Sequence, residues 1–285
     1  MLWMPSMGQT AMDWLEEGDA QFDMGNYNGA IRAYDKALNL NPRIAQAWYD
    51  KGYALARLEN YDEAIQAYDR AISLDPENAI AWNSKGDSLY GQGHHYDALQ
   101  AYDRALELDP RLSDAWYNKG YALADMGRNE EAIDAYDMAI YLDPENEAAW
   151  NNIGYALADL GRYAEAIRAY EGAIEANPGY AKAWYNRGNA LRSLGRYDEA
   201  INSFNRALDL DPNYIKAWKD KGNVLYDQGR YEEAILAYNQ ALALNPGNSE
   251  ARNKKGRALE QLERIEGSNA ALAKNRGYGY NNYYG

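Results

Sequence analysis

The chain has 285 residues, of which 47% are hydrophobic and 25% charged, so it can bury a large core. It contains no cysteine, which excludes disulfide frameworks and thiolate chemistry. Its net charge of −14 argues against nucleic acid as a partner, because nucleic acids are bound by basic surfaces.

The charge is unevenly distributed along the chain. Residues 1–146 hold 26 acidic and 11 basic side chains, whereas residues 147–285 hold 17 and 18. An acidic half can steer basic partners toward it or favour head-to-tail contacts between copies. It can equally be a solvated surface that aids solubility, and composition does not choose between these interpretations.

The first ten residues form a short leader, 1–10, before any repeating pattern begins. This leader has no basic segment and no apolar run long enough for a signal peptide, and no stretch of the chain has 18 consecutive apolar residues. We therefore expect no membrane span and a cytoplasmic protein by default. An extracellular or surface location stays open if a leader has been removed.

A glycine recurs every 34 residues along nearly the whole chain. With Ala11 as the first place of a unit, the fourth place is Trp in seven successive units, the twentieth and twenty-seventh are Ala, and the thirty-second is Pro. A fixed period without insertions predicts a stacked array. The eighth-place glycines are Gly18, Gly52, Gly86, Gly120, Gly154, Gly188, Gly222 and Gly256. The seven full units are 11–44, 45–78, 79–112, 113–146, 147–180, 181–214 and 215–248.

Each unit contains two amphipathic helical patterns. In the second unit, Trp48, Gly52 and Leu55 share one face of a first helix, and Tyr68 lies on the apolar face of a second. Pro76 then prevents the second helix from continuing. A glycine inside a helix costs roughly 0.5–1 kcal/mol relative to Ala, so its recurrence predicts a seam where the two helices approach closely.

This pattern resembles the tetratricopeptide repeat, whose 34-residue signature has Trp, Gly, Ala, Tyr or Phe, Ala and Pro at these places. The resemblance covers residues 11–248. It implies an all-α, right-handed superhelical solenoid of antiparallel helix pairs, with the first helices lining a concave face. It also implies a protein or extended peptide as partner, no cofactor and no enzymatic activity.

An eighth unit begins at Ser249 but departs from the pattern. Arg252 replaces the Trp, and the sequence at 266–269 lacks the start of a second helix. We therefore expect residues 249–265 to form a single capping helix that closes the stack. The remaining segment, 266–285, is rich in Gly, Tyr and Asn and is expected to be a mobile tail.

In the family that this chain resembles, ligands contact places 2, 5, 6, 9, 12 and 13 of the first helices. By that correspondence, Asn118, Asn152 and Asn186 form a ladder of amides that could pair with the main chain of an extended peptide. Tyrosines at the fifth and ninth places offer adaptable contact area, although they could instead pack against the next helix. The remaining expected groove residues are Asn189, Tyr49, Tyr53, Tyr117, Tyr121, Tyr155, Tyr185, Lys182 and Lys216.

Catalysis has little support in the sequence. The only histidines, His94 and His95, are adjacent in a turn, where two side chains rarely converge on one metal, and no phosphate loop or nucleophile motif is present. We expect no metal site.

The sequence thus predicts a non-catalytic interaction scaffold. The alternative is a self-assembling subunit that joins its neighbours in an oligomer or filament through its leader and tail. The residues expected to carry that self-association are Leu2, Trp3, Met4, Tyr278, Tyr280, Tyr283 and Tyr284.

Overall fold

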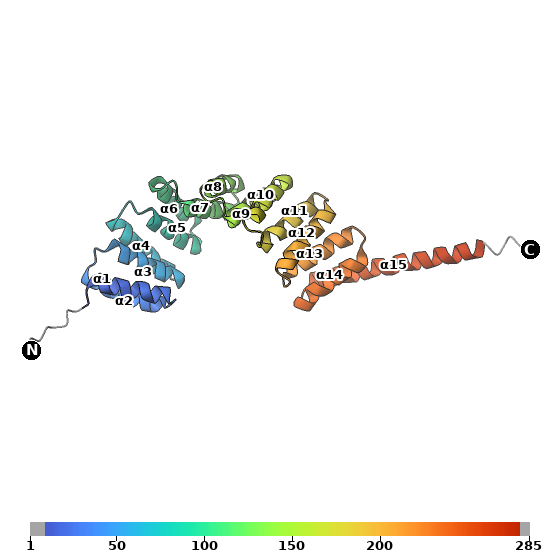
Figure 1. Ribbon diagram of the computed structural model, residues 1–285, viewed down its shortest axis with the longest axis horizontal. Coiled ribbons are helices and arrows are strands. Elements are labelled where there is room, and N and C mark those ends of the chain that lie inside the picture. The colour runs from blue at the N-terminus through green and yellow to red at the C-terminus, as the bar shows by residue number, and fades with distance from the viewer. Residues whose placement is uncertain (1–8, 280–285) are drawn as a thin grey trace, which may run out of the picture. The chain divides into compact units, whose positions relative to one another are not determined.

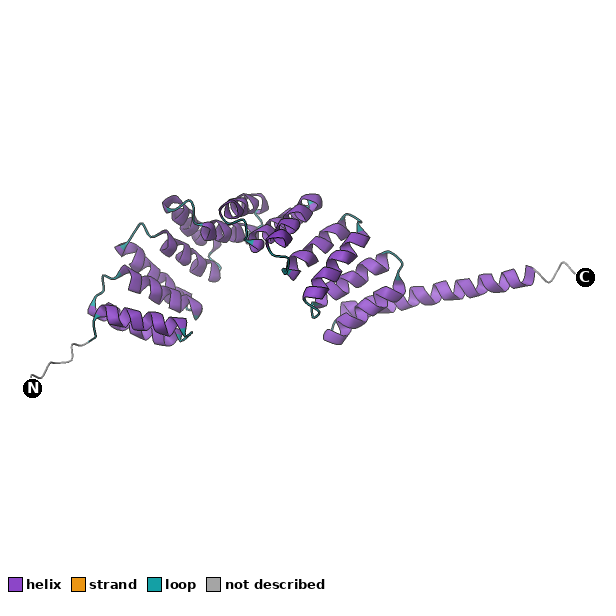
Figure 2. Ribbon diagram, in the orientation of Figure 1, coloured by secondary structure: helices purple, strands orange, loops and turns teal. Residues whose placement is uncertain are grey.

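The computed structural model describes residues 9–279, with side chains up to residue 269. Within this range the chain is helical and contains no strand (Figure 2). Each repeat contributes two helices that pack against each other, so the predicted all-α solenoid of antiparallel helix pairs is confirmed. The described part of the chain contains no helix that is both long enough and apolar enough to cross a membrane.

The helices fall into two compact units, divided between Pro144 and Glu145. They are labelled in Figure 1. Unit 1 contains α1 (Ala11–Asp23), α2 (Tyr27–Leu40), α3 (Ala45–Arg57), α4 (Tyr61–Leu74), α5 (Ala79–Gly91), α6 (His95–Leu108), α7 (Ser113–Asp125) and α8 (Asn129–Leu142). Unit 2 contains α9 (Glu147–Asp159), α10 (Tyr163–Ala176), α11 (Ala181–Ser193), α12 (Tyr197–Leu210), α13 (Ile215–Asp227), α14 (Tyr231–Leu244) and α15 (Ser249–Gly279).

Backbone chemistry sets the ends of both helices in a repeat. The turn after most first helices contains a glycine with positive φ, such as Gly161 at 74°, a conformation that glycine adopts without steric cost. In the second repeat Glu59 occupies this position with φ of 61°. Second helices stop two residues before the repeated proline, and the intervening residue is extended, as a residue before proline must be.

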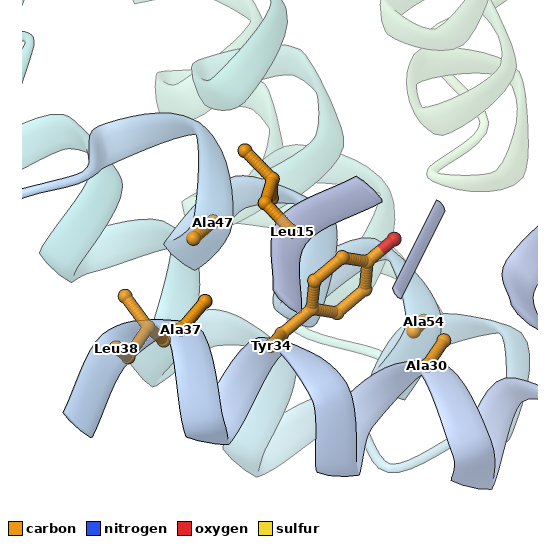
Figure 3. Packing of buried hydrophobic residues seen from close by; sticks show 7 residues of the cluster. All are labelled: Leu15, Ala30, Tyr34, Ala37, Leu38, Ala47 and Ala54. Atoms are coloured by element: carbon orange, nitrogen blue, oxygen red, sulfur yellow. The ribbon is translucent and has the colours of Figure 1, made fainter. Parts of the chain in front are cut away.

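A buried aromatic ring, a tyrosine in every full repeat except the sixth, joins the two helices of each repeat. In the first repeat, Tyr34 extends from α2 beside Leu15 of α1 (Figure 3). It packs over Gly18, where a Cβ atom would overlap its ring. The same geometry recurs in the second repeat, where a Cβ on Gly52 would lie 2.8 Å from the ring of Tyr68. This confirms the predicted seam and explains why glycine is retained inside a helix.

Two contacts recur between a repeat and the one before it. The indole N–H of Trp48 donates to the backbone carbonyl of Pro42, at 2.9 Å, in the preceding loop. Lys51, one turn further along α3, pairs with Asp35 of α2 at 2.6 Å and lies over the Trp48 ring. The repeated proline therefore ends a helix and also supplies an acceptor to the next repeat.

Helix α15 begins where the capping helix was expected but is longer. Ala251 and Ala258 are buried, and α15 packs against α14, as a cap should. The expected end at residue 265 is wrong, because the helix continues to Gly279. Residues 270–276 are rich in Ala, Leu, Lys and Arg, which favour helix, and one Gly-Ser step at 267–268 does not interrupt them.

The expected self-association residues cannot be placed as contacts. Leu2, Trp3, Met4, Tyr280, Tyr283 and Tyr284 lie outside the described residues. Tyr278 belongs to α15, in the part where only the backbone is described.

Candidate binding surface on the first helices

All twelve expected groove residues lie on first helices, and each unit has its own set. We call the surface that these helices form the first-helix face of a unit. In unit 1 it carries Tyr49 and Tyr53 on α3, and Tyr117, Asn118 and Tyr121 on α7. In unit 2 it carries Asn152 and Tyr155 on α9, Lys182, Tyr185, Asn186 and Asn189 on α11, and Lys216 on α13.

The tyrosines divide into two groups by place in the repeat. Those at the ninth place are exposed: Tyr53 by 40%, Tyr121 by 45% and Tyr155 by 57%. Those at the fifth place are half-buried, and Tyr185 for example donates its hydroxyl to Asp220 of the next repeat at 2.8 Å and has its ring 4.8 Å from that of Tyr214. The packing interpretation therefore holds at the fifth place, whereas the rings at the ninth place are left uncovered.

The asparagines at the sixth place bond to the preceding repeat. The amide of Asn118 donates to Asn83 at 3.2 Å and to Asp87 at 2.8 Å, and the amide of Asn186 donates to Asn151 at 2.8 Å. Residues at places five and six of successive repeats thus pair across 35 positions. Sequence reasoning missed this use of the amides, although the pairing of polar residues at that fixed offset could have indicated it.

Two pockets open on the first-helix face of unit 1. The α1–α3 pocket has a volume of about 340 Å³, and the α5–α7 pocket has a volume of about 310 Å³. The first is lined by Asp19, Phe22, Asp23, Tyr34, Tyr49, Asp50 and Tyr53. The second is lined by Asp87, Tyr90, Tyr102, Tyr117, Asn118 and Tyr121.

Each pocket holds a carboxylate that accepts a hydrogen bond from a core tyrosine. Tyr34 donates to Oδ1 of Asp19 at 2.9 Å, and Tyr102 donates to Oδ1 of Asp87 at 2.9 Å. These are the tyrosines that pack over the repeat glycines, so the scaffold itself fixes the position of the carboxylates.

Two carboxyl groups in these pockets have raised pKa values. Burial raises the pKa of Asp87 to about 6, although the hydrogen bond from Tyr102 opposes this, and Asp114 adds to it. Burial likewise raises the pKa of Asp50 to about 6, opposed by a hydrogen bond from Gln46 and reinforced by Asp19. The Asp87 side chain still has solvent exposure, although many protein atoms lie near its carboxyl group. Both sites therefore disfavour an uncompensated negative charge.

The first-helix face of unit 2 is different. Lys182 and Lys216 are exposed and make no ion pair within the described residues. Asp220, in contrast, is buried, where it accepts hydrogen bonds from Tyr185 and from Asn223 at 3.1 Å. This face presents amides and cations, and the carboxylate of Asp220 is used in internal contacts.

The histidines lie together at the start of α6. His94 is the residue before the helix and His95 is its first residue, with its ring 5.0 Å from that of Tyr90. Within residues 9–269, no group of three or more His, Asp or Glu side chains is arranged to hold a metal ion.

Comparison with known proteins identifies the repeat. The model of the tetratricopeptide repeat matches residues 15–79, 83–147 and 151–215, and further models of this repeat match residues 203–236 and 222–262. No curated protein matches the chain.

Several solved structures have a similar fold. The chain is 26% identical to YrrB, described as a TPR protein with an unusual peptide-binding site, over 67% of this chain and 99% of YrrB, with a TM-score of 0.58. It is 29% identical to the MamA protein over 62% of this chain and 96% of MamA, with a TM-score of 0.55.

A third structure supports the fold alone. The C-terminal part of a TPR repeat-containing protein from Cytophaga hutchinsonii is 18% identical over 84% of this chain and 98% of its own length, with a TM-score of 0.71. The repeat models together cover most of the residues, and the helix pairs follow the same 34-residue period. The chain belongs to the tetratricopeptide repeat family.

Proposed function

We propose that this protein is a non-catalytic interaction scaffold that binds an extended peptide or protein segment along its first-helix face. The observation that carries the proposal is the exposure of aromatic rings at the ninth place, where Tyr53, Tyr121 and Tyr155 present large contact areas that the scaffold does not cover. Tyrosine supplies such area with little side-chain entropy to lose, which suits recognition of varied segments. The likeness to YrrB, which has a peptide-binding site, supports the same role.

The asparagines of the amide ladder supply a second kind of contact for a bound segment, namely hydrogen bonds. Both N–H donors of Asn118 and one of Asn186 are used within the array, which holds each amide plane in a fixed orientation and leaves Asn118 only its oxygen for a ligand. An asparagine amide has two N–H donors and an acceptor oxygen, so the remaining groups can pair with the main chain of a bound segment. Asn152 and Asn189 extend the set of amides on unit 2, and Lys182 and Lys216 add two cations to it.

The absence of catalytic machinery in the sequence supports a binding role. The carboxylates recur at places set by the repeat and pair with nearby arginines, as Glu165 does with Arg162. Their positions follow from helix capping and surface charge. We propose the cytoplasm as the default compartment, with an extracellular or surface location as the alternative if a leader has been removed.

Peptide selection tests the proposed function. A displayed library of random 12-residue peptides is panned against the full chain, and the enriched peptides are measured by fluorescence anisotropy. We expect Tyr155→Ala to weaken binding about tenfold, and Asn152→Ala and Asn186→Ala to weaken it by about 1 kcal/mol each. Tyr141→Ala is the matched control, because Tyr141 is an exposed tyrosine on the second helix α8.

Two results would oppose the proposal. One is a library that yields no enriched peptide. The other is a set of peptides whose affinity falls equally with Tyr141→Ala and with Tyr155→Ala, which would place them away from the first-helix face.

Helix α15 favours self-association as a second candidate function. Residues 263–269 are all exposed, so this part of the helix is not covered by the array. Leu259 and Ile265 are exposed apolar side chains on it. Light scattering of the full chain and of a chain cut after Glu266 tests this candidate, since assembly that survives the cut does not depend on the removed segment.

A further inference from the structure

The two pockets of unit 1 are copies of one site, separated by two repeats. Asp19, Phe22 and Tyr34 in the first correspond to Asp87, Tyr90 and Tyr102 in the second, each 68 residues later. Tyr49, Asp50 and Tyr53 likewise correspond to Tyr117, Asn118 and Tyr121. The repeat itself has a period of 34, so this site follows a doubled period.

The doubled period arises from two alternating places on the first helices. In the four successive repeats of unit 1, the ninth place is occupied by Asp19, Tyr53, Asp87 and Tyr121. The twelfth place is occupied by Phe22, Ala56, Tyr90 and Ala124. A carboxylate and a ring therefore occur together only in the first and third repeats, and the exposed tyrosine of the next repeat completes each pocket. The buried Ala and Tyr of the second helices, in contrast, occupy the same places in all four repeats.

Aromatic rings enclose both pockets. In the α1–α3 pocket, the Phe22 and Tyr53 rings lie 5.2 Å apart, and Tyr49 lies 6.2 Å from Tyr53. In the α5–α7 pocket, Tyr90 and Tyr121 meet edge to face at 5.5 Å. The faces of such rings attract cations.

The carboxylates add negative charge without a protein cation to neutralise it. No Lys or Arg lines either pocket, and the hydrogen bonds found for Asp19 and Asp87 end on Oδ1. Oδ2 of each is thus available to a ligand. A cation placed there would satisfy the carboxylate and stack on the rings at the same time.

We propose that unit 1 binds an extended segment of a partner protein that carries two Lys or Arg side chains about six residues apart, one in each pocket. This inference rests on the proposed function and specifies the partner for one half of the face. The first helices of successive repeats contact one another, and packed helices lie about 8–10 Å apart, so two repeats separate the pockets by roughly 20 Å. An extended chain advances about 3.3 Å per residue, so roughly six residues span that distance, and residues an even number apart face the same side.

The partner is a peptide because each pocket is open and lies on a continuous face. A single cation in one open pocket binds weakly, whereas a segment that fills both gains from the high effective concentration of its second cation. The excess of acidic residues in the first 146 would also attract a basic segment at low ionic strength.

Synthetic peptides test this inference against the full chain. The reference peptide has two lysines six residues apart on a neutral Ala/Ser/Gly backbone, with variants that carry the lysines three apart, carry one lysine, or carry two glutamines. We expect the six-residue spacing to bind at least tenfold more tightly than the single-lysine peptide by fluorescence anisotropy. The advantage should shrink as salt is raised.

Variants of the protein test whether the lysine peptide binds in the two pockets. Asp19→Asn and Asp87→Asn keep an acceptor for Tyr34 and Tyr102 and should each weaken the six-spaced peptide about tenfold. Tyr121→Leu should weaken it several-fold, because it keeps an apolar side chain but removes a ring. Asp134→Asn is the charge-matched control, since Asp134 is exposed on α8 and lines neither pocket, and it should leave affinity unchanged.

Several outcomes would overturn the inference. They are equal affinity for the three-spaced and six-spaced peptides, equal loss with Asp134→Asn and Asp87→Asn, and binding of the glutamine peptide as tight as that of the lysine peptide. Spermidine that binds as tightly as the six-spaced peptide would identify a small-cation site instead. If these peptides fail while library peptides bind and depend on Tyr155, the proposed function stands and only this inference is lost.

Discussion

Units 1 and 2 have the same buried scaffold but different exposed chemistry. In each, a core tyrosine packs over the helix glycine, as Tyr136 does over Gly120 in unit 1 and Tyr238 over Gly222 in unit 2. A Cβ on either glycine would lie 2.8 Å or 2.6 Å from the ring. The places that set the stacking of repeats are therefore held constant along the chain.

The first-helix faces differ at places that the scaffold leaves free. Unit 1 combines carboxylates with rings in two pockets, whereas unit 2 presents amides and the exposed Lys182 and Lys216. The comparison teaches that one repeat can carry two different surface chemistries, because many of its places are not buried in the core. Changes to the shared scaffold should therefore act alike in both units, and changes at the free places should act in one.

The largest expected effect comes from filling the shared seam. Gly52→Ala in unit 1 and Gly222→Ala in unit 2 should each destabilise the protein by about 1–3 kcal/mol, because the new methyl group must displace a buried tyrosine ring. Urea denaturation followed by circular dichroism would measure this.

The glycine at the same place of the eighth unit has no tyrosine ring beside it. Gly256 of α15 has nothing within 4 Å of the position that a Cβ would take, since no second helix follows it. Gly256→Ala should therefore stabilise by about 0.5–1 kcal/mol through helix propensity alone. A loss of stability there, equal to that at Gly52, would contradict the packing explanation.

The two units also differ in the residue at the turn after the first helix, and this difference should affect stability. Unit 2 has glycine at this turn in all three of its full repeats, whereas the second repeat of unit 1 has Glu59 with positive φ. Glu59→Gly should stabilise unit 1 by about 1 kcal/mol, because a side chain in this conformation is strained. Gly195→Ala, in unit 2, should cost a similar amount, and a rise in its denaturation midpoint would argue against strain as the cause.

The pH dependence of stability should also distinguish the units. In unit 1, Asp50 and Asp87 have pKa values raised to about 6, so the folded state binds their protons more tightly than the unfolded state does. Their contribution favours folding below about pH 4 and is lost as pH rises through 6. Because water reaches both groups, the expected effect is at most about 1 kcal/mol.

The variant Asp50→Asn with Asp87→Asn isolates this contribution. It should be more stable than the parent at pH 7 and similar to it at pH 4.5, as measured by urea midpoints. If the variant and the parent differ in stability by the same amount at pH 4.5 and pH 7, the two carboxyl groups do not titrate with raised pKa values.

The packing of the buried residues could be predicted from the sequence. The contacts of the residues outside the core could be predicted only in part. Periodic Gly, Ala, Tyr and Pro are each required by a specific contact, so their spacing indicates the helix pairs and the seam. The hydrogen bonds of Asn118 depend on which atoms of Asn83 and Asp87 lie within reach of its amide, and the spacing of residues in the sequence does not determine that. The length of α15 was missed because composition suggested a tail while local helix propensity favoured continuation.

The smallest expected effect concerns an ion pair that Arg187 and Glu171 form in unit 2 but that the last full repeat of this unit lacks. In unit 1, Lys85 pairs with Asp69 of the preceding repeat at 2.6 Å, and its place is equivalent to that of Lys221 in unit 2. Asn205 stands where the acid would be, and burial lowers the pKa of Lys221.

Asn205→Asp should supply the missing partner. We expect it to raise the pKa of Lys221 and to stabilise unit 2 by about 0.5 kcal/mol at low salt, the usual size for a partly exposed pair. A double-mutant cycle with Lys221→Met separates the pair from other effects of the new charge. Because salt screens such pairs, the coupling energy should fall toward zero at 1 M salt. A coupling that persists there would mean that the introduced carboxylate stabilises the helix by another route, and the missing ion pair at Lys221 would then not explain any difference in stability.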